Sequence, residues 1–355
     1  MRLKPLDRQV VVIMGAASGI GRQAALDFAR RGAQLVLADS DPEGLASVAE
    51  EVAALGAEAA TVLADTADLA QVRRAAETAD QRFGRLDTWV QTAAVSIYAP
   101  LTRTEPEELR RVIEVNLLGV GYALSAALPR LRREGQGAII VVSSAEAMRS
   151  LPLQGAYSAS KHGVHALLEA LRVELAHSGD QIAVTEIMPA TTATPFFAKA
   201  ATKLGVMPRG IPPVYHPRVA AQAIVYAAEH PTRTIYTGGA GRLLGLLNCL
   251  SPRLVDGFLL ATGFELQRTQ VRRPDPYFGN LYEPVPGKDA VVGDIGYPVL
   301  SFSPYTWFQT HPVVGRAMKA AALGLAVGSA LGRFRRKRSG ILPIPEFEDV
   351  KSWKT

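Results

Sequence analysis

Residues 9–21, QVVVIMGAASGIG, decide the fold of this chain. The first six are an apolar run typical of a buried strand. The glycines after them let the backbone turn sharply and approach an anion closely, and a helix starting there presents free N–H groups and a positive dipole end. The stretch predicts a strand, a phosphate-binding turn and a helix, although the glycine string alone also suits a plain β–α turn. The expected anion contacts are Gly15, Ser18, Gly19, Ile20 and Gly21.

Short apolar runs alternate with helical patterns from this turn to about residue 240. Most of the runs are continuously apolar, which is typical of parallel strands covered by helices on both faces. Apolar residues at helical spacing mark 105–132 and 157–178. This βαβα order predicts the α/β class, with a doubly wound, mostly parallel sheet of seven strands. The expected strands are 9–14, 33–38, 59–64, 88–93, 138–143, 182–188 and 233–237.

Composition limits the classes of function. The 355 residues are 48% hydrophobic and 20% charged, which argues against disorder. Cys249 is the only cysteine, so an intramolecular disulfide and a cysteine-based zinc site are excluded, and a reducing compartment fits. The net charge is +6, but the run RFRRKR at 333–338 holds five positive charges, so we expect no nucleic-acid-binding face. The amino terminus lacks the pattern of a signal peptide, and we expect a cytoplasmic protein.

Asp39 closes the second expected strand, after the glycines. A carboxylate there can accept hydrogen bonds from ribose hydroxyls and would repel a 2′-phosphate. No Lys or Arg occupies the glycine turn or directly follows Asp39, which favours NAD over NADP. The alternative is an aspartate that caps the next helix, a role that Asp41 could fill instead.

Tyr157 and Lys161 form a YxxxK pattern at the start of a helix, so both side chains lie on one face. A free phenol, with a pKa near ~10, is a poor base at neutral pH, and a neighbouring ammonium lowers that pKa. The pair can then pass a proton while hydride moves to or from a nicotinamide. Ser144 ends the fifth expected strand, where a hydroxyl can polarise a carbonyl group or cap a turn; Ser143 could do the capping instead.

Asn116 lies between Ile113 and Leu117 on the otherwise apolar face of the helix at 105–132. A buried amide without partners is costly, so this side chain needs hydrogen bonds. It either pairs with backbone for structural reasons or takes part in the chemistry, and the two roles can coexist.

Together these residues resemble the compact type of the short-chain dehydrogenase/reductase family, over about residues 1–240. The resemblance implies a Rossmann-type domain that transfers hydride between NAD(H) and a small-molecule alcohol or ketone. It also implies catalytic roles for Ser144, Tyr157 and Lys161, and a water held by Asn116 that relays protons to the lysine. Family habit further implies a homo-oligomer that packs through the helices at 105–132 and 157–178.

Further positions match the cofactor site of that family. Asp65 matches the aspartate that holds the adenine amino group, although an ordinary strand-end acid is the alternative. Pro189-Ala-Thr-Thr-Ala-Thr194 resembles the PG-x-x-x-T segment beside the nicotinamide, which implies that Thr194 binds the carboxamide. Ala190 stands where the family usually has Gly.

Two segments depart from the family pattern. Met14 stands where a Thr usually begins the glycine motif, and Gln91-Thr92-Ala93-Ala94 replaces Asn-Asn-Ala-Gly beside the adenosine ribose, with Ala93 as the expected contact. The second change keeps open a nucleotide-binding scaffold with weakened turnover. A sugar-nucleotide epimerase or dehydratase is the other alternative, but those enzymes usually carry GxxGxxG, whereas this chain has GxxxGxG.

Residues 241–355 fall outside the compact pattern and are expected to form a helical and irregular extension. The Leu-rich pieces of 243–264 predict a substrate lid or a dimer contact in preference to a membrane hairpin. The apolar run at 320–332 is shorter than the roughly 20 residues that span a bilayer. Followed by the basic run 333–338, it predicts either an interfacial membrane helix or a helix packed on the core. The apolar segments near the cleft favour a hydrophobic or bulky substrate.

Overall fold

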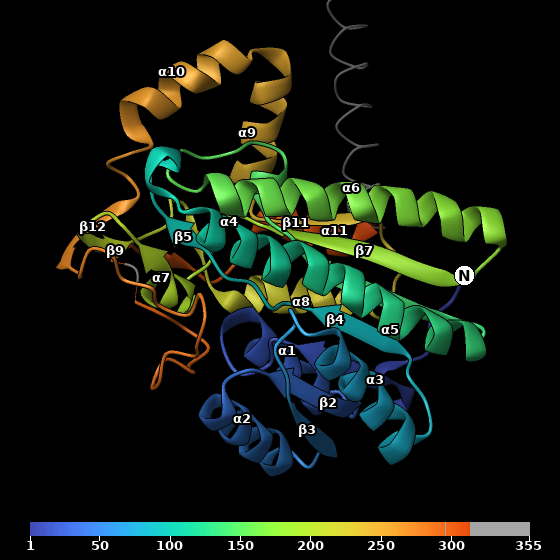
Figure 1. Ribbon diagram of the computed structural model, residues 1–355. Helices are drawn as coiled ribbons and strands as arrows, with labels where there is room; N and C mark the ends of the chain where they lie inside the picture. The colour runs from blue at the N-terminus through green and yellow to red at the C-terminus, as the bar shows by residue number, and fades with distance from the viewer. Residues whose placement is uncertain (295, 313–355) are drawn as a thin grey trace, which may run out of the picture. The chain divides into compact units, whose positions relative to one another are not determined.

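The computed structural model describes residues 1–294 and 296–312 (Figure 1). Its centre is one parallel sheet of seven strands in the order β11-β7-β6-β4-β1-β2-β3, which is a doubly wound arrangement. Every predicted strand is present, within two residues of its expected bounds. The strands are β1 (Val10–Met14), β2 (Gln34–Asp39), β3 (Ala59–Leu63), β4 (Thr88–Gln91), β6 (Gly137–Val142), β7 (Ile182–Pro189) and β11 (Thr234–Thr237).

Both faces of the sheet are covered, which explains the continuously apolar strands. In β1, Val11 and Ile13 face one core cluster, whereas Val10 and Val12 face the other, and all four are buried. The first cluster lies beneath α1 (Gly19–Arg30), α2 (Pro42–Ala54) and α8 (Pro217–Ala227). The second lies beneath α3 (Leu69–Phe83), α5 (Gly119–Arg133) and α6 (Gly155–Ser178).

The helix predicted at 105–132 is interrupted in the structure. It consists of α4 (Pro106–Ile113), one π-helical turn η3 (Glu114–Leu118) and α5. Among the described residues, 106–133 is the one helical stretch with the length and apolar composition of a membrane span. Half of its most apolar window is buried, and Val112, Val120 and Ala123 pack in the core, so it is a core helix.

Short elements lie around the ends of the strands. Three two-stranded sheets pair β5 (Ile97–Tyr98) with β8 (Ala201–Thr202), β9 (Val206–Pro208) with β12 (Arg268–Arg272), and β10 (Val214–Tyr215) with β13 (Val299–Leu300). The short helices are the 3₁₀ turns η1 (Leu6–Arg8), η2 (Leu101–Arg103) and η4 (Ala145–Ala147), and the α-helical turn α7 (Phe196–Lys199).

The first part of the predicted extension is helical. The Leu-rich pieces around Pro252 form α9 (Gly239–Leu250) and α10 (Pro252–Thr262), and α11 (Pro304–Thr310) follows later. Residues 1–310 form one compact unit. The expectations for 320–332 and 333–338 lie outside the described residues, and the domain boundary at 240 stays a prediction.

The glycine turn gives the first testable prediction. A Cβ on Gly21 would lie 1.9 Å from the Gly15 carbonyl oxygen, which is backbone and cannot yield cheaply. We expect Gly21→Ala to lower the free energy of unfolding by about 2 kcal/mol or more. Gly121→Ala is the matched control, because a Cβ there meets nothing within 4 Å, and alanine in a helix should add about 0.5 kcal/mol. Denaturant unfolding of both variants checks this, and equal stability of the two would contradict it.

Candidate active site

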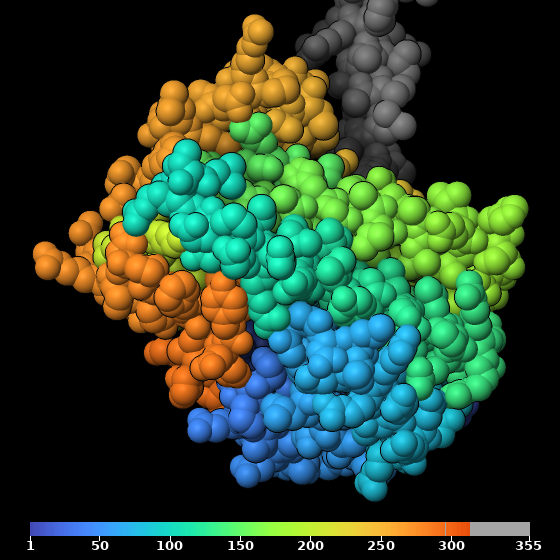
Figure 2. Space-filling model, viewed as in Figure 1, coloured from blue at the N-terminus to red at the C-terminus, as the bar shows by residue number. Residues whose placement is uncertain are grey.

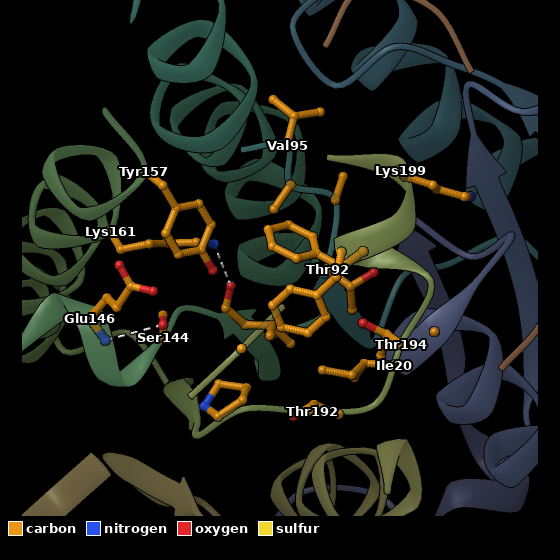
Figure 3. A pocket seen from close by; sticks show the side chains of 18 of the residues that line it. Ile20, Thr92, Val95, Ser144, Glu146, Tyr157, Lys161, Thr192, Thr194 and Lys199 are labelled. Atoms are coloured by element: carbon orange, nitrogen blue, oxygen red, sulfur yellow. Dashed lines mark hydrogen bonds between the residues drawn. The ribbon is translucent and has the colours of Figure 1, made fainter. Parts of the chain in front are cut away.

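One pocket lies at the carboxyl ends of the strands, where ligands bind in open parallel sheets. Every site residue expected from the sequence lines it except Asn116. Figure 3 shows two groups of side chains facing each other across it: Ser144, Tyr157 and Lys161 on one side, Ile20 and Thr194 on the other. The fold therefore brings the predicted catalytic and cofactor-binding residues to one place.

Ser144, Tyr157 and Lys161 form a compact buried group. Strand β6 ends at Val142, so Ser144 follows the strand rather than ending it, and its hydroxyl caps η4 by accepting the Glu146 N–H at 3.1 Å. Ser144 lines the pocket beside Tyr157 and acts to lower the pKa of the Tyr157 hydroxyl. One turn along α6, the Lys161 Nζ lies 5.5 Å from the centre of the Tyr157 ring and donates to the Val142 carbonyl at 3.0 Å.

The Ser143 hydroxyl, the other candidate for the turn, is buried without a hydrogen-bond partner among the described residues. Ser144, not Ser143, is therefore the turn cap. Its hydroxyl accepts a hydrogen bond in that role and can still donate one into the pocket, because a hydroxyl both accepts and donates.

Asp39 faces the start of α1 from the end of β2. Its carboxylate accepts the Ala17 N–H at 2.9 Å and the Asp41 N–H at 3.1 Å. Burial raises the pKa of Asp39, and these two N–H groups act in the opposite direction. Asp41, not Asp39, caps α2 by accepting the Gly44 N–H at 3.1 Å, so the capping alternative for Asp39 is wrong.

The family model for short chain dehydrogenases matches residues 9–205, more than half of the chain. The chain belongs to the short-chain dehydrogenase family. It is also 33% identical to the uncharacterized oxidoreductase YxnA of Bacillus subtilis over 94% of both chains. This protein is therefore a member of a family of oxidoreductases.

Solved structures agree with this assignment. A short-chain dehydrogenase/reductase from Burkholderia phymatum in complex with NAD is 26% identical, with a TM-score of 0.64 over 71% of this chain and 96% of that one. An alcohol dehydrogenase from Thermococcus sibiricus, complexed with 5-hydroxy-NADP, is 27% identical, with a TM-score of 0.57 over 64% and 95% of the two chains. Both neighbours share the Rossmann-type fold of this dehydrogenase.

The unusual segment 91–94 is fully bonded in this dehydrogenase. The Thr92 hydroxyl lies 2.9 Å from the carbonyl oxygens of both Met14 and Gly15, which ties the end of β4 to the glycine turn. The Gln91 amide donates to Thr66 at 2.9 Å and accepts from the Trp89 ring at 3.1 Å. Ala93 lines the pocket beside them. The departure from the family pattern therefore leaves the sheet and the turn firmly connected.

Asn116 lies in the π-helical turn η3, below the pocket. Its side-chain amide accepts the Val95 N–H at 2.9 Å and donates to the Val95 carbonyl at 2.9 Å and to the Ser160 hydroxyl at 3.0 Å. These bonds give the buried Asn116 amide the partners that the structural role requires, and they connect the loop after β4 to α6. The water relay to Lys161 stays a prediction.

The segment after β7 closes the pocket opposite Tyr157. Thr194 is buried and packs against the glycine turn, since a Cβ on Gly19 would lie 3.0 Å from its methyl group. Pro189 ends β7 and lines the pocket. The methyl group of Ala190, at the position where the family usually has Gly, faces Gly238. A Cβ added to Gly238 would lie only 2.9 Å from that methyl group, so the glycine at 238 leaves the room that Ala190 needs.

Asp65 lines the pocket but already has a cationic partner. Its carboxylate receives the Arg111 guanidinium at 2.6 Å and the Ala67 N–H at 2.9 Å. Arg111 also donates to the Leu281 carbonyl at 2.9 Å. The sequence did not indicate this ion pair, because Arg111 lies on α4, far from Asp65 in the chain. The adenine contact stays a prediction.

Glu146 is a pocket residue that sequence reasoning missed, although it lies only two positions after Ser144. Its carboxylate accepts the Ser158 hydroxyl at 2.7 Å. Burial raises the pKa of Glu146 to about 7, against the opposing effects of Ser158 and Lys161. The site therefore contains an acid that titrates near neutral pH.

Glu146 also changes the expectation for Tyr157. Burial raises the pKa of Tyr157 above its usual value, Glu146 raises it further, and the Ser144 hydrogen bond lowers it. Burial lowers the pKa of Lys161 to about 8. The expectation that a neighbouring ammonium lowers the tyrosine pKa is thus outweighed in this structure by burial and by the Glu146 charge.

Lys199 is the second residue that sequence reasoning missed. From α7 it reaches the start of α1, where its Nζ donates to the Ser18 hydroxyl at 3.1 Å and lies 3.9 Å from the Asp41 carboxylate. Burial lowers the pKa of Lys199, while Asp39, Asp41 and Asp289 act to raise it. The glycine turn therefore has a cation beside it after all, supplied from a distant part of the sequence.

Residues 279–293, which we call the strap, cross the pocket over the glycine turn. Gly19 donates its N–H to the Ala290 carbonyl at 3.1 Å, and the Arg22 guanidinium donates to the Asp289 carbonyl at 2.8 Å. Near the other end, the Asn280 N–H donates to the Lys199 carbonyl at 2.8 Å. The strap lines the pocket through Asn280, Tyr282, Glu283, Pro284 and Val285.

Lys199 provides a test of the glycine turn as an anion site. Its ammonium lies at the helix N-terminus that would face a pyrophosphate, so Lys199→Met should raise the Kd for NADH about tenfold. Lys288→Met is the matched control, because Lys288 is an exposed lysine of the strap that does not line the pocket. Fluorescence titration measures both, and an unchanged Kd in Lys199→Met would show that the ammonium does not contact the cofactor.

Proposed function

We propose that this short-chain dehydrogenase interconverts an alcohol and a ketone with NAD(H) as hydride carrier. The observation that carries the proposal is the gathering of Ser144, Tyr157 and Lys161 on one side of the pocket that also contains the glycine turn, with the Lys161 Nζ 5.5 Å from the centre of the Tyr157 ring. A reaction that moves a hydride and a proton together requires a proton-transfer side chain next to the site of the dinucleotide, and Tyr157 lies next to the glycine turn in this way.

The residues present suit a dinucleotide. The amino end of α1 lines the pocket, where the Gly19 N–H donates to the Ala290 carbonyl of the strap and the Ser18 side chain makes no capping hydrogen bond with the helix. The start of α1 would hold the pyrophosphate, Asp39 the ribose hydroxyls and Thr194 the nicotinamide carboxamide. When bound, the nicotinamide ring accepts or delivers the hydride.

The protein's own groups would handle the substrate oxygen and its proton. In alcohol oxidation, Ser144 holds the substrate oxygen by a hydrogen bond and Tyr157 accepts the hydroxyl proton as the carbonyl forms. In reduction, Tyr157 returns that proton to the oxygen. Lys161 is buried one turn away, and when it is protonated its positive charge acts against the burial and the Glu146 charge that raise the pKa of Tyr157. These roles require only the three side chains that the fold gathers.

The charge around the glycine turn favours NAD over NADP. Asp39, Asp41 and Asp289 act on Lys199 here, and Arg22 is the second cation of this group, so three carboxylates face two cations at this end of the pocket. A 2′-phosphate would add two more negative charges to that set. Structural neighbours contain either NAD or an NADP derivative, so the preference depends on these residues and not on the neighbours.

The substrate side of the pocket favours a hydrophobic molecule. Around Tyr157 the pocket is lined by aromatic and aliphatic side chains from the core and from the hairpin α9–α10: Tyr98, Phe196, Phe197, Leu244 and Phe258. An apolar substrate gains by leaving water for such a surface.

The two alternative functions gain no support. The hypothesis of a weakened scaffold depended on the altered segment 91–94, in which Thr92 bonds to the glycine turn and Gln91 bonds to Thr66. The epimerase reading conflicts with the matching family model. Self-association through α5 and α6 and a cytoplasmic location stay predictions.

Tyr157→Phe is the direct test of the mechanism. Removing the hydroxyl should reduce kcat for alcohol oxidation by at least about a hundredfold, because proton transfer loses its acceptor. Tyr282→Phe, which removes a hydroxyl elsewhere on the same pocket, should leave kcat unchanged. A panel of alcohols and ketones with NAD(H) and NADP(H) in parallel, followed by nicotinamide absorbance, gives the measurement. Undiminished turnover in Tyr157→Phe would refute the proposed role.

The Glu146 carboxylate should set the pH dependence of oxidation. Its negative charge raises the pKa of Tyr157, so Glu146→Gln should lower that pKa and move the rising limb of the kcat/KM profile to lower pH by about one unit. Glu283→Gln, which neutralises another carboxylate of the pocket, should leave the profile in place. If the rising limb of the kcat/KM profile is unchanged or moves to higher pH in Glu146→Gln, the Glu146 charge does not control this pH dependence.

A further inference from the structure

The hairpin α9–α10 covers the substrate side of the pocket. Leu244, Phe258 and Leu259 line the pocket from the inner face of the hairpin. Arg149, five residues after Ser144, holds both helices, since its guanidinium donates to Asn248 of α9 at 3.0 Å and pairs with Asp256 of α10. The hairpin is therefore fixed to the loop that carries Ser144, and its role as a lid or a dimer contact stays a prediction.

The outer face of the hairpin is apolar and exposed. The large hydrophobic side chains that reach solvent there come from both helices and from the segment directly after α10. They are Leu243, Leu246, Leu247, Leu250, Leu254, Leu260 and Phe264. Monomeric soluble proteins rarely expose so many neighbouring apolar side chains, and such patches mark surfaces that bind proteins or membranes.

The shape and charge of the hairpin indicate which partner fits. Figures 1 and 2 show α9 and α10 standing out from the body of the protein. The hairpin contains Arg242 and Arg253 and one acidic residue, Asp256, which is already paired with Arg149, and three further arginines lie in β12 and directly after it. A projecting apolar hairpin with arginines in it and next to it matches an anionic lipid surface, where leucines enter the acyl boundary and guanidinium groups meet headgroup phosphates.

We propose that the α9–α10 hairpin docks this dehydrogenase onto anionic lipid bilayers, with its outer leucines in the interface. Because the inner face of the same hairpin lines the pocket, docking places the pocket next to the lipid. The substrate class that follows is a long-chain or polycyclic alcohol or ketone that partitions into the bilayer. The docking itself rests on the hairpin surface alone, whereas the substrate class also rests on the proposed function.

Vesicle flotation of the full chain tests the docking. Wild type should float with vesicles of phosphatidylcholine and phosphatidylglycerol, and much less with pure phosphatidylcholine. Leu250→Glu with Leu260→Glu, at side chains 82% and 76% exposed and outside the pocket lining, should reduce the bound fraction about tenfold. Leu63→Glu with Val173→Glu, at 55% and 68% exposed on the sheet domain, should bind like wild type.

Several outcomes would overturn the docking. The first is that wild type does not bind anionic vesicles. The second is that the hairpin variant floats like wild type, because another segment then binds the lipid. The third is that light scattering shows a wild-type dimer that becomes a monomer in the hairpin variant, while neither protein binds vesicles. Circular dichroism and oxidation of a short water-soluble alcohol should be the same in both double variants, which separates docking from folding.

The substrate class has its own measurement. With a long-chain alcohol embedded in anionic vesicles, the hairpin variant should show a turnover about tenfold below wild type, while its rate on a short soluble alcohol is unchanged. Equal rates on the embedded alcohol would refute the substrate class. If wild type floats but oxidises no alcohol at all, the proposed function fails while the docking stands.

Discussion

The close approach of α1 to the end of β1 is the constraint on which the site depends. A side chain at residue 21 would collide with the Gly15 carbonyl, and one at residue 15 would collide with Thr92, so only glycine lets the helix begin directly above the strand. That position aims the amino end of α1 into the pocket and brings Ser18 within reach of Lys199. The hydroxyl of Thr92 holds the same turn from the neighbouring strand.

The sheet and its helices could be predicted because their signals are local. Continuous apolar runs fix buried parallel strands, and the glycine turn, Asp39 and the Tyr157–Lys161 spacing each occupy a short stretch of sequence. Their common location then follows from topology, since the ends of neighbouring parallel strands meet at one edge. The π-helical turn around Asn116 left no such signal, because its wider spacing is set by the side chain's bonds to Val95 and Ser160.

The features that sequence reasoning missed are those that depend on distant segments. Lys199 reaches the glycine turn only because α7 folds back across the sheet, and Arg111 meets Asp65 from another helix. Glu146 was close to Ser144 in sequence, yet its significance lies in burial beside Tyr157 and Lys161, which composition does not reveal. The catalytic group thus contains the Glu146 carboxyl, the Tyr157 phenol and the Lys161 amine in one buried, low-dielectric space. The protonation state of each of these groups therefore changes the pKa of the other two.

The strap gives the extension a part in the architecture of the nucleotide-binding half. It supplies hydrogen-bond acceptors to Gly19, Arg22 and Arg111, three residues from the part of the chain that resembles the compact family. Shortening the gene to that compact region would strip these donors of their acceptors, and the extension could not be transplanted to another dehydrogenase without matching arginines. Because these donors and acceptors lie in different segments, a substitution on one side limits the residues that the other side can accept.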